Sequence, residues 1–143
     1  MPVRKGNAEW KGNLLEGSGT VGTETGVLKN TAYDFKSRFE SGSHTNPEEL
    51  IGAAHAGCFS MAFSGNLTKA GYKVISIQTE DKVHIEKQDI GFTITKIEVS
   101  TVGKVEGIDE ATFQKIAEDA KKGCPVSRAL TGVEFVLNAK LSQ

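Results

Sequence analysis

One long, almost uncharged helix-forming segment constrains the fold of this chain more than any other feature. Residues 50–70 are rich in Ala, Leu, Met and Phe, a composition typical of a helix that is buried on most of its surface. A start signal precedes the segment: Asn46 suits the N-cap, Pro47 the first helical position, and Glu49 a capping-box exchange with the cap. Gly71 supplies the left-handed residue that commonly ends a helix. The rest of the chain must therefore fold around a long apolar helix.

Shorter segments on both sides of this helix alternate apolar and polar residues, which is the pattern of half-buried strands. We expect strands at 3–10, 17–25, 33–40, 74–87, 92–102 and 133–141, a second helix from the Asp109 cap to Gly123, and a helical turn at 126–130. The apolar residues change parity after Ile94, which predicts a bulge near Thr95 and Lys96 or burial of both faces. Because the strands are clustered rather than alternating singly with helices, the fold class is α+β with a mainly antiparallel sheet.

The composition limits the classes of function. With 143 residues the chain is expected to form a single domain, residues 1–143. Its 17 Lys and Arg against 18 Asp and Glu give a net charge of −1, so no basic field attracts nucleic acid or anionic lipid. No apolar run reaches the roughly 18 residues of a membrane span, and the first residues lack the apolar stretch of a signal peptide. We therefore expect a cytoplasmic protein that binds neither nucleic acid nor membrane.

Two motifs resemble binding sites that their context does not support. Gly17, Gly19 and Gly22 fit the G-x-G-x-x-G pattern, but no helix pattern follows to receive a pyrophosphate. A glycine-rich hairpin or bend is favoured.

His55 and Cys58 lie three residues apart on one helix, yet a catalytic zinc normally takes three protein ligands. We therefore favour a packed His55 with satisfied hydrogen bonds and predict no metal.

Cys58 stands in the middle of the long helix. At 100° per residue, Glu48, His55 and Cys58 fall within a sector of about 80°, so one helix face carries a carboxylate, an imidazole and a thiol. A mid-helix thiol gains little from the helix dipole, so a reactive Cys58 needs a cation, for which Arg38 is the best candidate. The alternatives are a Cys58 that is a small buried hydrophobe and an Arg38 that only solvates a strand face.

The second cysteine, Cys124, lies between Gly123 and Pro125, where one helix has ended and another turn begins. Two cysteines are too few for a disulfide framework, and a reducing cytosol keeps idle thiols reduced, so any pairing is expected to be transient and chemical. The junction can expose the sulfur and present backbone N–H groups to it. Alternatively, Cys124 is a buried loop cysteine, and the sequence leaves both possibilities open.

Two segments around the cysteines together resemble the OsmC (osmotically inducible protein C) family of peroxidases. They are residues 45–61, TNPEELIGAAHAGCFSM, and residues 123–127, GCPVS, and the similarity extends from Trp10 to the last strand. The resemblance implies an intertwined homodimer whose mainly antiparallel sheet packs around the long cysteine-bearing helix. It also implies active sites at the subunit interface that reduce organic hydroperoxides in stress defence, without metal, haem, flavin or other cofactor.

The same resemblance assigns roles to residues. Cys58 attacks the peroxide, and Cys124 resolves the sulfenic acid as a Cys58–Cys124 disulfide, which an external dithiol such as a lipoylated protein reduces. Arg38 matches the arginine of this branch, and Glu48 matches the carboxylate of the Asn-Pro-Glu element. Arg38 is then expected to lower the pKa of Cys58, with Glu48 orienting Arg38 through a bidentate pair. The family commonly has alanine where this chain has Gly57, and glycine costs a helix interior up to about 1 kcal/mol.

Two other functions use the same residues. The cysteines of a peroxide-sensing or ligand-binding module would record oxidation without turnover, and those of a structural protein would be inert buried thiols. A sensing module differs from a peroxidase only in rate, whereas inert thiols would resist alkylation in the native protein. The sequence predicts the cysteine-based peroxidase first and sets steady-state consumption of hydroperoxide as the measurement that separates it from the sensor.

Overall fold

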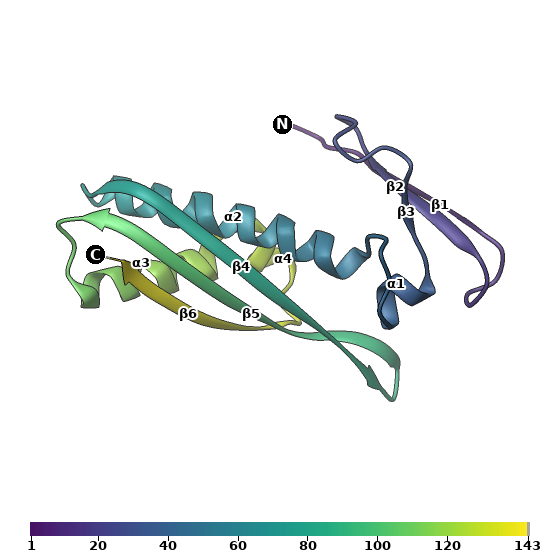
Figure 1. Cartoon of the computed structure of the whole chain (residues 1–143). Coiled ribbons are helices and arrows are strands. Elements are labelled where there is room, and N and C mark those ends of the chain that lie inside the picture. The colour runs from purple at the N-terminus through teal and green to yellow at the C-terminus, as the bar shows by residue number, and fades with distance from the viewer. Residues whose placement is uncertain (143) are drawn as a thin grey trace. The chain divides into compact units, whose positions relative to one another are not determined.

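The computed structural model describes residues 1–142, which divide into two compact units at the Leu50–Ile51 bond. Along the chain the elements are three strands, two helices, two strands, two helices and a last strand (Figure 1). The long helix α2 (Pro47–Lys69) begins in the first unit and runs through the second. The predicted α+β class is confirmed.

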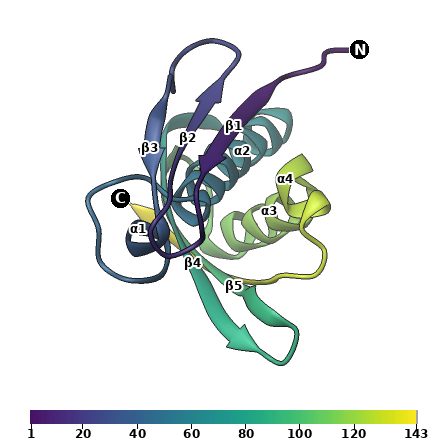
Figure 2. The ribbon, with the colours of Figure 1, turned by 90° about the vertical axis from the view of Figure 1, so that its right-hand side faces the viewer.

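The first unit contains a three-stranded antiparallel sheet in the order β1-β2-β3 (Figure 2). Its strands are β1 (Gly6–Lys11), β2 (Ser18–Thr23) and β3 (Thr31–Tyr33). Gly19 pairs with Trp10, and a Cβ on Gly19 would lie 2.6 Å from the rings of both Trp10 and Tyr33. The glycine-rich motif therefore belongs to a hairpin strand, where glycine makes room for aromatic rings, and the hairpin prediction is confirmed.

Residues 33–40 do not form the predicted strand. β3 ends there, and the short helix α1 (Phe35–Phe39) follows. The carboxylate of Asp34 caps this helix by accepting the Ser37 N–H at 2.8 Å, and the phenylalanine rings at its two ends lie 4.9 Å apart. Apolar residues two and four apart fit both a strand and a helix, and the cap decides for the helix.

The start and end of α2 are those predicted. The Asn46 side chain accepts the Glu49 N–H at 2.7 Å. The Glu49 carboxylate accepts the Thr45 hydroxyl at 2.7 Å, so the return bond comes from the residue before the cap. At the other end Gly71 takes a φ of +94°, a conformation that favours glycine.

One face of α2 is exposed in the single chain. The prediction that this helix is buried on most of its surface is therefore wrong for the single chain. The buried stripe consists of Gly52, His55, Phe59, Phe63 and Leu67. The opposite side, which we call the small-residue face, consists of Ala53, Ala54, Gly57, Met61 and Gly65. Met61 is 79% exposed there. No segment of residues 51–142 covers this face.

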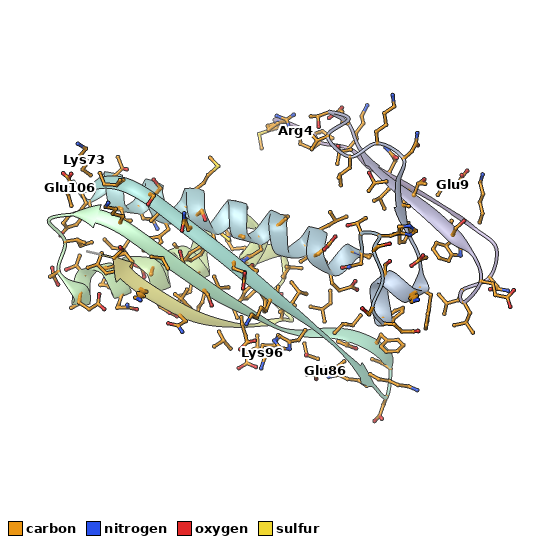
Figure 3. The ribbon with its side chains drawn as sticks, viewed as in Figure 1. Arg4, Glu9, Lys73, Glu86, Lys96 and Glu106 are labelled. Carbon is orange, nitrogen blue, oxygen red and sulfur yellow. The ribbon has the colours of Figure 1, made fainter. Side chains whose placement is uncertain are left out.

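The second unit contains a three-stranded sheet in the order β4-β5-β6. β4 (Lys73–Gln88) and β5 (Gly91–Glu106) are antiparallel, and β6 (Glu134–Ser142) runs parallel to β5. Lys73 and Glu106 mark one end of the long β4–β5 ladder, and Glu86 lies near the other (Figure 3). Thr95 is the extra residue between the pairs that Lys96 and Ile94 make with β4, which confirms the bulge.

Two helices connect β5 to β6. Asp109 caps α3 (Glu110–Gly123) by accepting the Thr112 N–H at 3.0 Å, and α4 (Pro125–Ala129) follows after Cys124. Apolar side chains of α2, α3 and β5 form the core: Phe59, Phe63, Leu67, Ile97, Val99, Val105, Phe113, Ala117 and Ala120. Among the described helices, none combines the length and hydropathy needed to cross a membrane.

Candidate active site

Arg38 and Glu48 form an ion pair within the first unit. Arg38 lies on α1, and its Nε donates to Glu48 Oε1 at 2.9 Å. Glu48 is only 6% exposed, and the guanidinium lies 5.0 Å from the centroid of the Phe39 ring. The alternative of an Arg38 that only solvates a strand face is therefore wrong, because Arg38 is on a helix and is paired.

The prediction that Arg38 and Glu48 form a bidentate pair is wrong. Only Glu48 Oε1 meets Arg38, through Nε, and the buried Oε2 has no hydrogen-bond partner within residues 1–142. Arginine carries five N–H donors, so this geometry leaves the terminal guanidinium nitrogens available to another group. A single-point contact fixes the position of Arg38 less tightly than a two-point contact would.

Aromatic side chains surround the arginine. A pocket of about 160 Å³ in the first unit is lined by Trp10, Leu14, Tyr33, Asp34, Phe35, Arg38 and Phe39. Most of this lining is apolar, and a guanidinium and a carboxylate supply its charge. Such a pocket suits a small ligand with an apolar body and a polar end.

Cys58 is partly buried on α2 in the second unit. Burial raises the pKa of its thiol, a backbone hydrogen bond from Val126 lowers it, and the neighbouring Cys124 thiol raises it, with a net upward shift. The two predicted redox cysteines are thus neighbours. The second unit by itself favours the neutral thiol of Cys58 over the thiolate.

Cys124 is fully buried at the junction between α3 and α4. Its sulfur accepts the Ser127 N–H at 3.4 Å and lies 3.0 Å from Ser127 Oγ. The sequence left open whether the Cys124 sulfur is exposed at the junction or buried in a loop. The structure shows that it is buried. It nevertheless receives a backbone N–H from the next helix, as the junction predicts.

His55 is packed and hydrogen-bonded at both ring nitrogens, as predicted. Nδ1 contacts Asp81 Oδ2, and Nε2 lies 2.7 Å from Ser127 Oγ. Both ring nitrogens are therefore occupied, and the ring does not act as a ligand beside Cys58. Asp81 and Ser127 were not predicted, because they stand 26 and 72 residues from His55 and carry no local motif.

The structure thus brings the four predicted site residues together as two pairs. Arg38 meets Glu48 in the first unit, and Cys58 meets Cys124 in the second. The first pair offers a positive charge beside an apolar pocket. The second places a partly buried thiol near a fully buried one.

Comparison with known proteins gives concordant results. The family model described as OsmC-like protein matches residues 40–138. The chain is 53% identical over 138 residues to Peroxiredoxin OsmC of Escherichia coli (strain K12), with 96% of each protein covered. It is 30% identical over 117 residues to Organic hydroperoxide resistance protein OhrB of Bacillus subtilis (strain 168), covering 80% of this chain and 83% of that protein.

Solved structures share the fold. The crystal structure of OhrB of Bacillus subtilis matches with a TM-score of 0.71 and 25% identity, covering 95% of this chain and 98% of that one. An organic hydroperoxide resistance protein from Elizabethkingia anophelis matches with a TM-score of 0.75 and 25% identity over 99% of each chain. The segment matched by the family model contains Glu48, Cys58 and Cys124, and Arg38 lies just before it.

Proposed function

Because the chain belongs to the OsmC family, we propose that it is a thiol-dependent peroxidase that reduces organic hydroperoxides to alcohols. The proposal is carried by the position of Cys58, which packs against the buried cluster that contains Cys124 and whose thiol pKa is affected by the Cys124 thiol. One thiol is partly exposed and the other is fully buried. This asymmetry suits a first cysteine that meets the substrate and a second that meets only the first.

The chemistry proceeds in three steps. The Cys58 thiolate attacks a peroxide oxygen, so that an S–O bond forms, the O–O bond breaks, and the alkoxide leaves and is protonated to the alcohol. The Cys124 thiol then displaces hydroxide from the Cys58 sulfenic acid, giving a disulfide and water. An external dithiol, which we assign to a lipoylated protein, reduces this disulfide by two exchange steps.

The thiolate needs a positive charge, and no cation is among the groups that shift the pKa of Cys58 within the described chain. Burial and Cys124 raise the pKa of Cys58, so we assign Arg38, held by Glu48, as the cation that opposes this shift. Ten residues of helix separate Glu48 from Cys58, a rise of about 15 Å. The Arg38–Glu48 pair of a second copy of the chain can approach Cys58 without spanning that rise. We therefore propose an intertwined homodimer in which each site uses both chains.

The small-residue face of α2 supports this assembly, because small side chains allow close approach of another chain. Light scattering at micromolar concentration should give the mass of two chains, and a monomer would contradict the assembly. Mixing Arg38→Ala chains, which react slowly, with inactive Cys58→Ser chains should give about a quarter of the parental activity after refolding together, since half of the dimers are mixed and each mixed dimer regains one site. No recovery would contradict shared sites.

The aromatic pocket beside Arg38 favours an organic hydroperoxide over hydrogen peroxide. An alkyl or aryl body gains by burial against Trp10, Leu14 and Phe39, whereas hydrogen peroxide has no apolar surface to bury. We assign the protein, as one OsmC-like domain without cofactor, to cytoplasmic defence against oxidative and osmotic stress.

Steady-state turnover tests the proposal. Cumene hydroperoxide and hydrogen peroxide are supplied separately with dihydrolipoamide. The parent is expected to consume cumene hydroperoxide over many cycles, and faster than it consumes hydrogen peroxide. Cys58→Ser should fall to background, because serine is not appreciably ionised at neutral pH and cannot replace the thiolate. A parent that is oxidised once without turnover would be a sensing module, and an active Cys58→Ser would remove Cys58 from its role.

A further inference from the structure

A line of hydrogen bonds connects the buried Cys124 thiol to a carboxylate. Cys124 Sγ lies 3.0 Å from Ser127 Oγ, Ser127 Oγ lies 2.7 Å from His55 Nε2, and His55 Nδ1 contacts Asp81. We propose that this line, the Cys124 relay, takes up the thiol proton when Cys124 attacks the Cys58 sulfenic acid. The proposal rests on the proposed peroxidase function and deepens it.

The partners determine where each proton lies in the reduced protein. The carboxylate of Asp81 only accepts, so the neutral His55 ring carries its proton on Nδ1 and leaves Nε2 as an acceptor. The Ser127 hydroxyl then donates to Nε2, and the Cys124 thiol donates to Ser127 Oγ. Every donor therefore points from the thiol toward the imidazole, which is the direction of proton transfer.

Burial makes this line the available route for the proton. His55, Asp81 and Cys124 side chains are fully buried, and the His55 ring stacks on the Phe135 ring with centroids 4.6 Å apart. Water cannot take the proton directly from a thiol with no exposed surface. His55 can accept it through Ser127, and the Asp81 carboxylate offsets the positive charge that the ring acquires.

The transfer also leaves the sulfur well hydrogen-bonded. Once Ser127 has passed its proton to His55 and taken that of the thiol, its hydroxyl donates to the Cys124 thiolate. The Ser127 N–H already points at the same sulfur at 3.4 Å. Ser127 therefore stabilises the attacking thiolate with two donors, His55 holds the proton, and Asp81 acts through His55 as a positioning residue.

The step balances. The Cys124 sulfur forms a bond to the Cys58 sulfur as the S–O bond of the sulfenic acid breaks, hydroxide leaves and takes a proton from solvent, and His55 holds the proton of the thiol. In the reductive step the dithiol attacks the partly exposed Cys58 sulfur, and Cys124 departs as a thiolate. His55 returns its proton through Ser127, so the relay is reset in each cycle.

A second histidine pair in the same unit provides a matched control. His84 Nε2 lies 2.6 Å from the Glu98 carboxylate on the partly exposed surface of the β4–β5 pair. It repeats the imidazole–carboxylate contact without a thiol. His84→Asn should therefore change neither peroxide consumption nor disulfide formation, whereas changes in the relay should affect disulfide formation.

Single-turnover kinetics separate the relay from the peroxidase itself. Reduced protein is mixed with one equivalent of cumene hydroperoxide, and loss of hydroperoxide and disulfide formation are timed separately by quenching and mass spectrometry. Ser127→Ala should slow disulfide formation about 100-fold more than hydroperoxide loss, the low end of general acid–base effects. Ser127→Thr, which keeps the hydroxyl, should recover most of that rate. Asp81→Asn, which keeps an acceptor but loses the charge, should slow disulfide formation less than Ser127→Ala does.

The outcomes are distinguishable. A parent that neither consumes hydroperoxide nor forms the disulfide would refute the proposed function. A competent parent whose Ser127→Ala variant forms the disulfide at the parental rate would overturn the relay alone. Equal slowing of both steps would also overturn it, because a packing defect explains that result.

The unmodified protein offers a measurement that no folding defect can affect. Nitrogen-15 NMR of the reduced protein should show the His55 ring protonated at Nδ1 and unprotonated at Nε2. A neutral ring protonated at Nε2 would reverse the hydrogen bond to Ser127 and overturn the relay.

Discussion

The surroundings of Cys58 and Cys124 differ because one cysteine lies within a helix and the other between two helices. The backbone N–H groups around a mid-helix residue are committed to the helix, and burial and a neighbouring thiol raise the pKa of Cys58. Cys124 instead precedes α4, and the free N–H of Ser127 donates to it. The comparison teaches that the same turn of α4 donates a backbone hydrogen bond to each sulfur, but that the one from Val126 does not offset the effects that raise the pKa of Cys58.

Removing Cys124 should affect the cycle more than any change at Arg38, Glu48 or Gly57. Cys124→Ser should complete one oxidation and then stop at the Cys58 sulfenic acid or a more oxidised state, because nothing resolves it. Steady-state consumption of hydroperoxide should fall to background after one equivalent, and mass spectrometry should find the oxidised Cys58. Normal catalytic cycles in this variant would reject Cys124 as the resolving cysteine.

Arg38→Ala should expose the unfavourable surroundings of Cys58. Without the cation the thiolate loses stabilisation, so the pKa of Cys58 rises, the thiolate fraction at neutral pH falls, and alkylation slows. The midpoint of alkylation against pH should move up by about 1–3 units. Arg38→Lys should restore the charge but not the donor geometry toward Glu48, and is expected to recover only part of the shift. An unchanged midpoint would place the charge partner elsewhere.

Changing the carboxylate should have a smaller effect than changing the arginine. Glu48→Gln keeps the cation and an acceptor for Arg38 Nε but weakens the alignment of the arginine, so the alkylation midpoint should rise by less than about 1 unit. Combining Glu48→Gln with Arg38→Ala should add little to Arg38→Ala alone, because Glu48 acts through the arginine. Independent, additive shifts would show that Glu48 has a separate role.

The smallest effect concerns the helix that carries Cys58. A Cβ on Gly57 meets nothing within 4 Å in the chain, so Gly57→Ala should raise the free energy of unfolding by up to about 1 kcal/mol. Gly71→Ala is the matched control, because its φ of +94° strains any side chain and reverses the sign. Urea denaturation measures both. A destabilised Gly57→Ala dimer would indicate that the partner chain contacts this position.

Local signals in the sequence were sufficient for the long elements. Asn46, Asp109 and Gly71 act at the ends of α2 and α3 as predicted, because caps depend on neighbours within four residues. The segment around Arg38 was predicted as a strand because its apolar residues recur every second position. Over so short a stretch, some of these residues are also four apart, which fits a helix equally well. A cap at Asp34 was the signal that would have distinguished the helix from a strand.

The chemistry of the site was only partly predictable. Arg38, Glu48, Cys58 and Cys124 stand in recognisable motifs, and the structure pairs them two by two. The single-point contact at Glu48 depends on side-chain geometry that no sequence pattern encodes. Contacts such as those of His55 bring together residues far apart in the chain, and they become visible only once the sheet and helices are in place.

The parallel pairing of β5 with β6 sets the order in which the two thiols acquire their surroundings during folding. Parallel neighbours require a crossover, and α3, Cys124 and α4 form it here. Helix contacts are local and form within about a microsecond, whereas pairing across a long connection comes later. The helix carrying Cys58 therefore forms before Ser127 reaches His55, 72 residues away. In the proposed cycle, a newly synthesised chain is therefore expected to carry the peroxide-attacking thiol on a formed helix before the hydrogen bonds around the resolving thiol are complete.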